Sequence, residues 1–330
     1  MRFLVTGASG FIGSTLAALL VSRGTKVRAL VRRSSRREGL ERIGAEVAFG
    51  DVTDEASLPA AVDGCDVVVH LAGLVKALGR RQLFRVNVEG TRHVARACAG
   101  AARPPILILV SSLAAAGPSG PSRPRVEEDA PAPVSRYGES KLLAEEALRG
   151  HDGLQATVVR PPIVYGPGDR EVMPPLLRMA RLGVILKAGF ADKRYSLVHV
   201  DDLCQGILAA AERGHRLDAS GSEGIYFLSD GGEHSWDDVG EAVCAALGRH
   251  GLVLPLPEVA GLPVALASSV LAALTRRPAT LSFDKMREIR QPAWTCSSAR
   301  AERELGWRPR LKLAEGMRRS VEWFREMGRA

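Results

Sequence analysis

Short runs of Val, Ile and Leu alternate with longer helical stretches through the first half of the chain. The apolar runs lack the strict in-and-out alternation of a half-exposed strand, which indicates strands that are buried on both faces. Strand–helix units of this kind predict an α/β fold with a doubly wound parallel sheet. The predicted strands are Phe3–Thr6, Lys26–Val31, Val47–Gly50, Val67–Leu71, Ile106–Ser111 and Ala156–Arg160, and the predicted helices include Ile12–Arg23, Ser57–Val62, Asn87–Ala99 and Tyr137–Arg149.

The pattern becomes less regular after residue 165, and we predict a change of organisation there. Residues 1–165 are expected to form one domain, and residues 166–330 a smaller lobe that is partly interleaved with it. The later elements that we predict are a turn at Gly166–Asp169, a strand over Ser196–His199, and a helix that runs from a cap at Asp201 or Asp202 to about Arg213.

One uncharged stretch, Val259–Thr275, is mostly apolar over 17 residues. It falls short of the roughly 20 residues that cross a bilayer, and Pro263 interrupts it, so we expect no transmembrane segment. A buried helix is the favoured interpretation. A wall for a lipophilic substrate or a contact with a membrane surface are the alternatives.

Composition narrows the class of partner. Of the 330 residues, 46% are hydrophobic, which is enough for a large core, and the formal net charge is +8. Only 5% are aromatic, and the basic residues are scattered, with no long Lys/Arg tract beyond the Arg pairs at 32–33 and 36–37. Scattered charge with few aromatics disfavours nucleic acid, and it indicates an anionic small molecule instead.

The five cysteines lie far apart in the sequence, with no CxxC pair. This spacing predicts neither a disulfide framework nor a metal site, and it suits a reducing cytoplasm. No secretory signal is expected, because a strand pattern already begins at Arg2.

The segment Thr6–Gly13 reads TGASGFIG and joins the first predicted strand to the first predicted helix. Gly7 permits a tight turn, Gly10 lets backbone amides approach a pyrophosphate, and Gly13 allows the helix to pack closely on the strand. The N-terminus of the helix then faces the anion. The sequence therefore predicts that residues 1–165 are a Rossmann-type dinucleotide-binding domain and that residues 166–330 are mainly a substrate-binding lobe.

The residue that follows the second strand indicates which dinucleotide binds. An acidic residue about 20 positions after the glycine loop would favour NAD by binding the ribose 2′-hydroxyl. Arg32 and Arg33 stand there instead, and a guanidinium can bind a 2′-phosphate. We therefore expect NADP, with NAD as the alternative if these arginines are only solvated. Asp51 is placed either to bind the adenine or to cap the next helix.

Tyr137 and Lys141 are four residues apart on a predicted helix, so their side chains share one face. A nearby ammonium favours the phenolate and lowers the pKa of a tyrosine, which can then exchange a proton near neutral pH. Ser111 and Ser112 follow the strand over Ile106–Val110, where a hydroxyl can bind a substrate carbonyl. The spacing predicts proton transfer coupled to hydride transfer.

Together these features resemble the extended branch of the short-chain dehydrogenase/reductase superfamily, the epimerase/dehydratase-like group, over nearly the whole chain. The motifs that carry the resemblance are TGASGFIG at 6–13, GDVTD at 50–54, HLAG at 70–73, NVEGT at 87–91, SSLAAAG at 111–117, YGESK at 137–141, RPPIVYGPGD at 160–169 and ARAERELGWRP at 299–309.

The resemblance implies roles for individual residues. It makes Tyr137 the acid/base, Lys141 the group that orients the ribose and tunes Tyr137, and Ser112, rather than Ser111, the group that polarises the carbonyl. Asn87 matches a helix asparagine that supports the site. Family members often dimerise through the helices that here begin near Asn87 and Tyr137, so a homodimer is expected. The implied dinucleotide contacts are Gly7, Ser9, Gly10, Phe11, Ile12, Gly13, Arg32, Asp51, Val52, Leu71, Ala72, Gly73, Tyr137, Lys141, Pro162, Ile163 and Val164.

The loop after the serine favours one subgroup. Sugar-nucleotide dehydratases have an acidic pair where this chain has Leu113 and Ala114, and epimerases usually have an aromatic residue where it has Ala116. The segment is more similar to 3β-hydroxysteroid dehydrogenases and dihydroflavonol-reductase-like ketoreductases. The resemblance therefore implies an NAD(P)-dependent oxidoreductase for a carbonyl or alcohol. A small-molecule substrate is expected, and the apolar stretch Val259–Thr275 would suit a lipophilic one.

Two alternatives remain open at this point. Lys193 and Arg194 stand where sugar-nucleotide enzymes often hold a diphosphate, and Arg170 is similarly placed, which favours a nucleotide-sugar epimerase. A sensor that binds NADP without turnover is the other alternative, although all three catalytic candidates are present.

Overall fold

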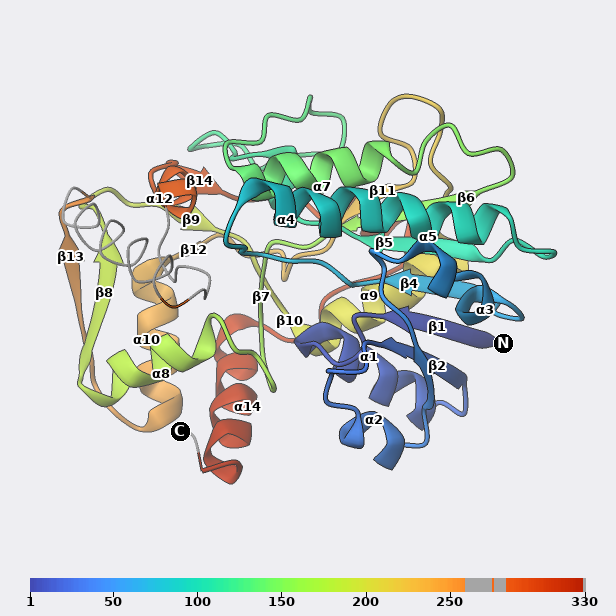
Figure 1. The fold of residues 1–330 in the computed structure, drawn as a ribbon. Helices are drawn as coiled ribbons and strands as arrows, with labels where there is room; N and C mark the ends of the chain where they lie inside the picture. Colours follow the sequence, from blue (N-terminus) through green and yellow to red (C-terminus); the bar gives the residue numbers. More distant parts are fainter. Residues whose placement is uncertain (259–274, 276–282, 329–330) are drawn as a thin grey trace.

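The computed structural model of the chain describes residues 1–258, 275 and 283–328, which form two lobes (Figure 1). Except for Thr275, the apolar stretch Val259–Thr275 lies outside the described residues. The first lobe contains the glycine loop and the YxxxK helix, and the second contains the remaining small strands and helices.

A seven-stranded parallel sheet forms the centre of the first lobe, with the strand order β11-β6-β5-β4-β1-β2-β3. Its middle strands are buried on both faces, as Val5, Val68 and Ile108 illustrate with no exposed surface. The predicted doubly wound α/β sheet is therefore confirmed. The strands are β1 (Arg2–Thr6), β2 (Lys26–Val31), β3 (Glu46–Phe49), β4 (Val67–His70), β5 (Ile106–Val110), β6 (Gln155–Arg160) and β11 (Ile225–Phe227).

Helices cover both faces of the sheet through two separate apolar clusters (Figure 1). On one face lie α1 (Phe11–Ser22), α2 (Glu38–Arg42), α9 (Val200–Arg213) and α13 (Ala299–Leu305). On the other lie α3 (Pro59–Val62), α5 (Gly90–Ala99) and α7 (Arg136–Glu146), with the short elements η1 (Glu55–Ser57), α4 (Arg80–Phe84), η2 (Arg85–Glu89) and α6 (Leu113–Ala116) connected to them. β11 comes from the second half of the chain, and the division near residue 165 stays a prediction.

Two helix starts differ from the prediction. The helix expected from Asn87 begins at Arg80, and Asn87 lies in a π-helical turn over Arg85–Glu89. The cap expected at Asp201 or Asp202 is instead His199, whose ring accepts a hydrogen bond from the amide of Asp201 at 3.2 Å. An imidazole nitrogen replaces the usual cap oxygen here, and the Asp202 carboxylate accepts from the amide of Leu311 at 2.8 Å.

The second lobe packs around its own apolar core, which includes Met173, Leu176, Val243 and Met317. Its small sheets pair β7 with β10, β9 with β12 and β14, and β8 with β13. The strands are β7 (Ile163–Tyr165), β8 (Val184–Ala188), β9 (Arg194–Tyr195), β10 (Leu197–His199), β12 (His234–Ser235), β13 (Leu252–Leu256) and β14 (Ala293–Trp294), and the helices are α8 (Met173–Arg181), α10 (Trp236–Leu247), α12 (Phe283–Ile289) and α14 (Leu313–Glu326).

Candidate active site

The glycine loop between β1 and α1 has the geometry of an anion cradle. Gly7 has φ of 68°, and a Cβ added there would lie 2.7 Å from the amide nitrogen of Ala72. A Cβ at Gly13 would lie 2.3 Å from the carbonyl oxygen of Gly7, whereas Gly10 has open space apart from that same oxygen. No side chain caps the N-terminus of α1. Its amides and the open space at Gly10 therefore fit the pyrophosphate of a dinucleotide.

A buried chain of hydrogen bonds behind this loop connects β1 to the neighbouring strand β4. The Thr6 hydroxyl lies 2.7 Å from Nδ1 of His70, and Nε2 of His70 lies 3.1 Å from the Thr91 hydroxyl. Thr6 also accepts hydrogen bonds from the amides of Leu71 and Ala72. Burial lowers the pKa of His70 to about 3, so the ring is neutral. Thr6 and His70 belong to motifs that the sequence analysis identified. The glycine pattern did not reveal that their side chains hydrogen-bond to each other.

At the end of β2, exposed arginines surround an exposed aromatic ring. Arg33 and Arg37 lie over the Phe49 ring, 5.3 and 5.4 Å from its centre, and Arg32 is exposed beside them. The Asp51 carboxylate accepts from the amide and hydroxyl of Thr53, both at 2.9 Å. It does not cap the next helix, whose N-cap residue is Asp54. Arg37 also pairs with Glu41 at 3.0 Å. Val52 is buried against Gly90 of α5.

Asn87 connects the loop after β4 to α7, the helix that carries Tyr137 and Lys141. Its amide group donates to the carbonyl of Leu74 and to the Ser140 hydroxyl, both at 2.9 Å, and its oxygen accepts from the amide of Leu74 at 2.7 Å. A Cβ at Gly73 would lie 3.3 Å from that oxygen and 4.0 Å from Nζ of Lys141. Residues 71–73, which were predicted to contact the dinucleotide, therefore lie close to Asn87 and Lys141 at the carboxyl edge of the sheet.

The two serines after β5 have different partners. The Ser111 hydroxyl donates to the buried carboxylate of Glu145, whereas Ser112 caps α6 and hydrogen-bonds to Tyr137. Helices α6 and α7 approach closely because position 138 is glycine, where a Cβ would lie 2.3 Å from the carbonyl oxygen of Ala114. The fold thus leaves Ser112, rather than Ser111, beside the phenol.

The pKa values of Tyr137 and Lys141 differ from the expectation. Burial raises the pKa of Tyr137 to about 12, while the hydrogen bond with Ser112 lowers it in part and the charge of Glu288 raises it. Burial also lowers the pKa of Lys141 to about 8, against the opposing charge of Glu145. Nζ of Lys141 donates to the carbonyl of Val110 at 2.8 Å. The expected lowering of the tyrosine pKa is wrong for this structure, because burial outweighs the hydrogen bond with Ser112 and Lys141 does not offset it.

An ion pair of Glu145 and Arg160, both almost fully buried, supports this arrangement and was missed from the sequence. Arg160 Nε donates to Glu145 at 3.0 Å, and the guanidinium lies 5.7 Å from the centre of the Phe227 ring. Glu145 stands one helical turn after Lys141, so a spacing signal was available. Sequence reasoning could not supply the partner on β6.

The segment after β6 lies between the carboxyl edge of the seven-stranded sheet and the second lobe. Pro162, Ile163 and Val164 are partly buried there, and a Cβ at Gly168 would lie 3.6 Å from the Phe11 ring of the glycine loop. The segment after β6 therefore lies close to the glycine loop.

Of the three cations that favoured a sugar-nucleotide site, Lys193 and Arg194 are engaged in ion pairs. Lys193 is buried and bonds through Nζ to Glu258 at 2.6 Å and to the carbonyl of Ile289 at 2.5 Å. Arg194 pairs with Asp192 at 2.5 Å. Arg170 is exposed.

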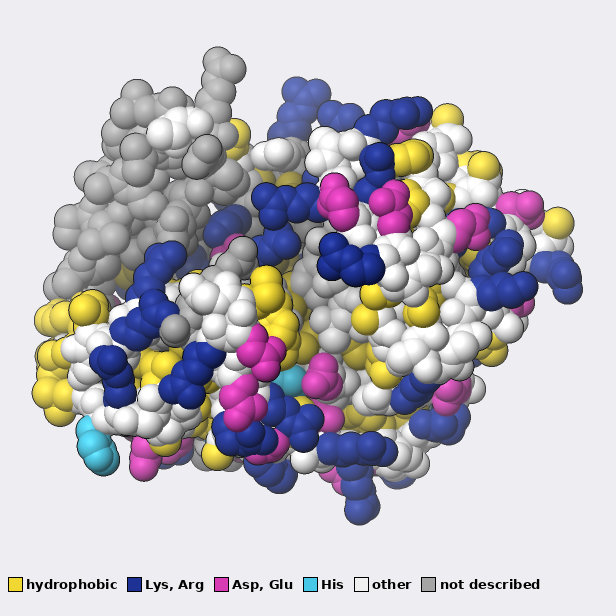
Figure 2. Space-filling model, turned by 90° about the horizontal axis from the view of Figure 1, so that it is seen from below, with side chains coloured by type: hydrophobic (Ala, Val, Ile, Leu, Met, Phe, Trp, Pro, Cys, Tyr) yellow, Lys and Arg dark blue, Asp and Glu magenta, His cyan; other side chains and the backbone are white. Residues whose placement is uncertain are grey.

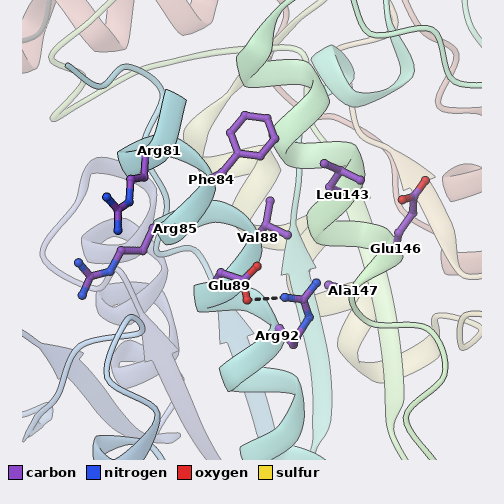
Figure 3. A pocket seen from close by; sticks show the side chains of 9 residues that line it. All are labelled: Arg81, Phe84, Arg85, Val88, Glu89, Arg92, Leu143, Glu146 and Ala147. Atoms are coloured by element: carbon purple, nitrogen blue, oxygen red, sulfur yellow. Dashed lines mark hydrogen bonds and ion pairs between the residues drawn. The ribbon is translucent and has the colours of Figure 1, made fainter. Parts of the chain in front are cut away.

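A groove of about 600 Å³ runs along the outer face of the first lobe, between the α4–η2–α5 helix and α7 (Figure 3). Phe84, Val88 and Leu143 form its apolar floor, and Arg92 pairs with Glu89 across one side. None of the catalytic candidates lines this groove.

The described residues contain no group of three potential metal ligands, and their five cysteines are buried and free. Among the described helices, none is long and apolar enough to cross a membrane.

Comparison with known proteins agrees with this geometry. A ceramide reductase from Caulobacter vibrioides is 31% identical over 98% of this chain and 94% of the relative. A 4-hydroxy-2-methyl-3-oxo-4-farnesyl-3,4-dihydroquinoline-1-oxide ketoreductase from Stigmatella aurantiaca is 35% identical over 70% of this chain and 69% of the relative. The fold matches a UDP-glucose 4-epimerase from Thermus thermophilus in complex with NAD, with a TM-score of 0.75, 24% identity, and coverage of 98% and 99% of the two chains.

The fold and site define a nicotinamide-dinucleotide enzyme of the extended short-chain dehydrogenase/reductase class. More specifically, residues 3–222 match the model of the NAD dependent epimerase/dehydratase family, and the chain belongs to that family.

Proposed function

We propose that this protein is an NADP-dependent ketoreductase that acts on a lipophilic carbonyl compound. The observation that carries the proposal is the convergence of Ser112, Tyr137 and Lys141 beside the glycine loop. Two of the named relatives are reductases, one for a ceramide and one for a farnesylated quinoline oxide. Both names describe substrates with long apolar groups, which supports a lipophilic substrate here.

The dinucleotide, when bound, supplies the hydride. Tyr137 keeps its proton up to a pKa of about 12, so it is a donor at neutral pH and can protonate the carbonyl oxygen during reduction. Ser112, which already hydrogen-bonds to Tyr137, can donate to the same oxygen and hold it in place. Lys141 is positioned by the carbonyl of Val110 and would bind the ribose.

The preference for NADP rests on the arginines after β2. Arg32 is exposed at the end of that strand, and no acidic residue takes the place that would bind a ribose hydroxyl. Arg33, stacked on Phe49, extends the cationic surface toward the same side. NAD remains the alternative cofactor.

A panel of carbonyl compounds tests the function. With NADPH, ceramide-like, steroid-like and polyketide-like ketones should produce net oxidation of the cofactor, followed by its absorbance. UDP-sugars belong in the same panel, since interconversion without net oxidation would identify an epimerase and contradict the proposal. Tyr137→Phe should reduce turnover by about 10²–10⁴-fold, as expected for loss of an acid/base. Retained turnover in that variant would refute the mechanism, and a non-catalytic sensor would keep its function.

We also propose that the protein forms a homodimer through the groove of Figure 3. An apolar floor between two exposed helices suits a self-complementary helical interface. Val88→Arg should convert the dimer to a monomer in analytical ultracentrifugation, and an unchanged mass would contradict this assignment. The five free cysteines further support a reducing compartment such as the cytoplasm.

A further inference from the structure

The two strands β8 and β13 form a small parallel ribbon at the edge of the second lobe (Figure 1). Its inner face packs on α10, where Ile185 and Val253 lie against Gly240 and Lys187 pairs with Asp237. Its outer face consists of three cross-strand pairs: Val184 with Leu252, Leu186 with Leu254, and Ala188 with Leu256. All six of these outward positions are apolar.

This pattern is the reverse of what a water-facing ribbon requires. When one face of a sheet packs on the core, the other face normally carries polar side chains. Here the exposed fractions are 62% for Leu252, 41% for Leu186 and 43% for Leu256. Leu182 and Phe190, which flank β8, are 82% and 72% exposed.

The exposed apolar surface is concentrated in this one place. Six of the eleven large hydrophobic side chains that are exposed in the described part of the chain belong to the ribbon and its flanks. Figure 2 shows hydrophobic side chains gathered at the left edge of the molecule, with Lys and Arg side chains next to them. A contiguous patch of this kind marks a surface that binds something apolar.

The charges beside the patch indicate what it binds. Arg178, Arg181 and Arg249 are exposed at the end of the ribbon where both strands begin, and Arg249 donates to the carbonyl of Arg181 at 2.7 Å. No ion pair joins any of the three to a carboxylate of the described residues. At the opposite end the carboxylates are neutralised, because Asp192 pairs with Arg194 and Glu258 with Lys193.

We propose that the outer face of the β8–β13 ribbon docks on the surface of an anionic lipid bilayer. Leucine and phenylalanine side chains enter the boundary between headgroups and acyl chains, while the three arginines contact lipid phosphates. The reason for docking rests on the proposed function, since a lipophilic carbonyl substrate is found in the membrane. The docking itself does not depend on which substrate is reduced.

Sedimentation of the full chain with vesicles tests the proposal. We expect the protein to sediment with vesicles of phosphatidylcholine and phosphatidylglycerol, and less with phosphatidylcholine alone. The double variant Leu252→Ser/Leu254→Ser should bind at least tenfold more weakly. Arg178→Gln and Arg181→Gln should each weaken binding to the anionic vesicles about fivefold, as expected for a basic residue near a charged surface.

Matched controls separate the ribbon from general surface properties. Val75→Ser removes another exposed apolar side chain, and Arg103→Gln removes another exposed arginine, both outside the ribbon. Both control variants should bind as the unchanged protein does. Circular dichroism should be the same for all variants, because the substituted side chains face solvent.

Three results would overturn the proposal. They are an unchanged protein that stays in solution with every vesicle, ribbon variants that bind normally, and a dimer in solution that Leu252→Ser/Leu254→Ser converts to a monomer. The last result would assign the face to a second copy of the chain. All measurements are made without dinucleotide or ketone, so their failure leaves the reductase proposal intact, and reduction of a water-soluble ketone tests that separately.

Discussion

The carboxylate of Asp284 accepts a hydrogen bond from the backbone amide of Tyr137 at 3.4 Å, although the two residues are 147 positions apart. The same carboxylate accepts from the amide of Arg136 at 2.8 Å, and Glu288, one turn later on α12, accepts from the Ser135 hydroxyl at 2.6 Å. A carboxylate at the start of α7 is favoured by the helix dipole. Helix α12 of the second lobe therefore holds the turn that positions Tyr137.

Replacing Asp284 by Ala should lower kcat about fivefold, because losing a helix cap costs about 1 kcal/mol and loosens the turn that bears Tyr137. Dinucleotide affinity should stay the same, since the glycine loop is not involved. Asp284→Asn, which still offers an oxygen, should recover most of the activity. Arg287→Ala, an exposed change on the same helix, serves as the control. Equal kcat in the Asp284→Ala and Arg287→Ala variants would show that the contact has no catalytic effect.

The pH dependence of reduction should report Lys141. Its pKa of about 8 means that the ammonium is present below pH 8 and is lost above it. The kcat/KM of reduction in the free enzyme should therefore fall as the pH rises through about 8, well below the titration of Tyr137. The arginine of a Lys141→Arg variant stays charged at all these pH values. This variant should therefore show no fall of kcat/KM near pH 8, and its highest kcat/KM should be lower than that of the unchanged protein. The same fall at the same pH in Lys141→Arg would exclude Lys141 as its origin.

Arg32→Asp should change the cofactor preference. Charge-assisted hydrogen bonds are worth about 1.5–3 kcal/mol, so kcat/KM with NADPH should fall about 10–100-fold. The value with NADH should stay equal or rise. Arg103→Asp makes the same charge change at an exposed site on another loop and controls for net charge. If the ratio of NADPH to NADH activity does not move, the ribose-phosphate pocket is elsewhere.

The buried pair of Glu145 and Arg160 should be important for stability. Glu145→Ala leaves a buried guanidinium without its partner, which typically costs about 3–5 kcal/mol of unfolding free energy. The double variant Glu145→Gln/Arg160→Met removes both charges and should lose less. Urea denaturation measures the free energy of unfolding of both variants. A double variant less stable than Glu145→Ala would mean that the pair itself, and not the unpaired charge, sets the cost.

Local pattern and glycine spacing predicted the sheet, the glycine loop and the face shared by Tyr137 and Lys141. These features depend on neighbours in the sequence, since strand burial, turn conformation and helical spacing are set within a few residues. The helix ends were less accurate because His199 serves as a cap through a ring nitrogen. Nothing in the sequence near position 199 distinguishes that use from an ordinary buried histidine.

The rest could not be predicted because it depends on contacts between distant segments. Burial, and not the charge of Lys141, decides the pKa of Tyr137, and burial arises only after α12 and the sheet are assembled. Likewise Lys193 has the residue type of a diphosphate ligand, but tertiary packing joins it to Glu258. The partner of Glu145 lies on β6, so the place of Glu145 one turn after Lys141 was a signal for its position but not for the ion pair.

Lys193 also links two segments that are far apart in the sequence. Because it bonds to both Glu258 and the carbonyl of Ile289, it ties together the chain before residue 259 and the end of α12. Helix α12 in turn carries the Asp284 carboxylate, which accepts from the amide of Tyr137. A buried lysine of the second lobe therefore helps to fix the start of α7 in the first lobe.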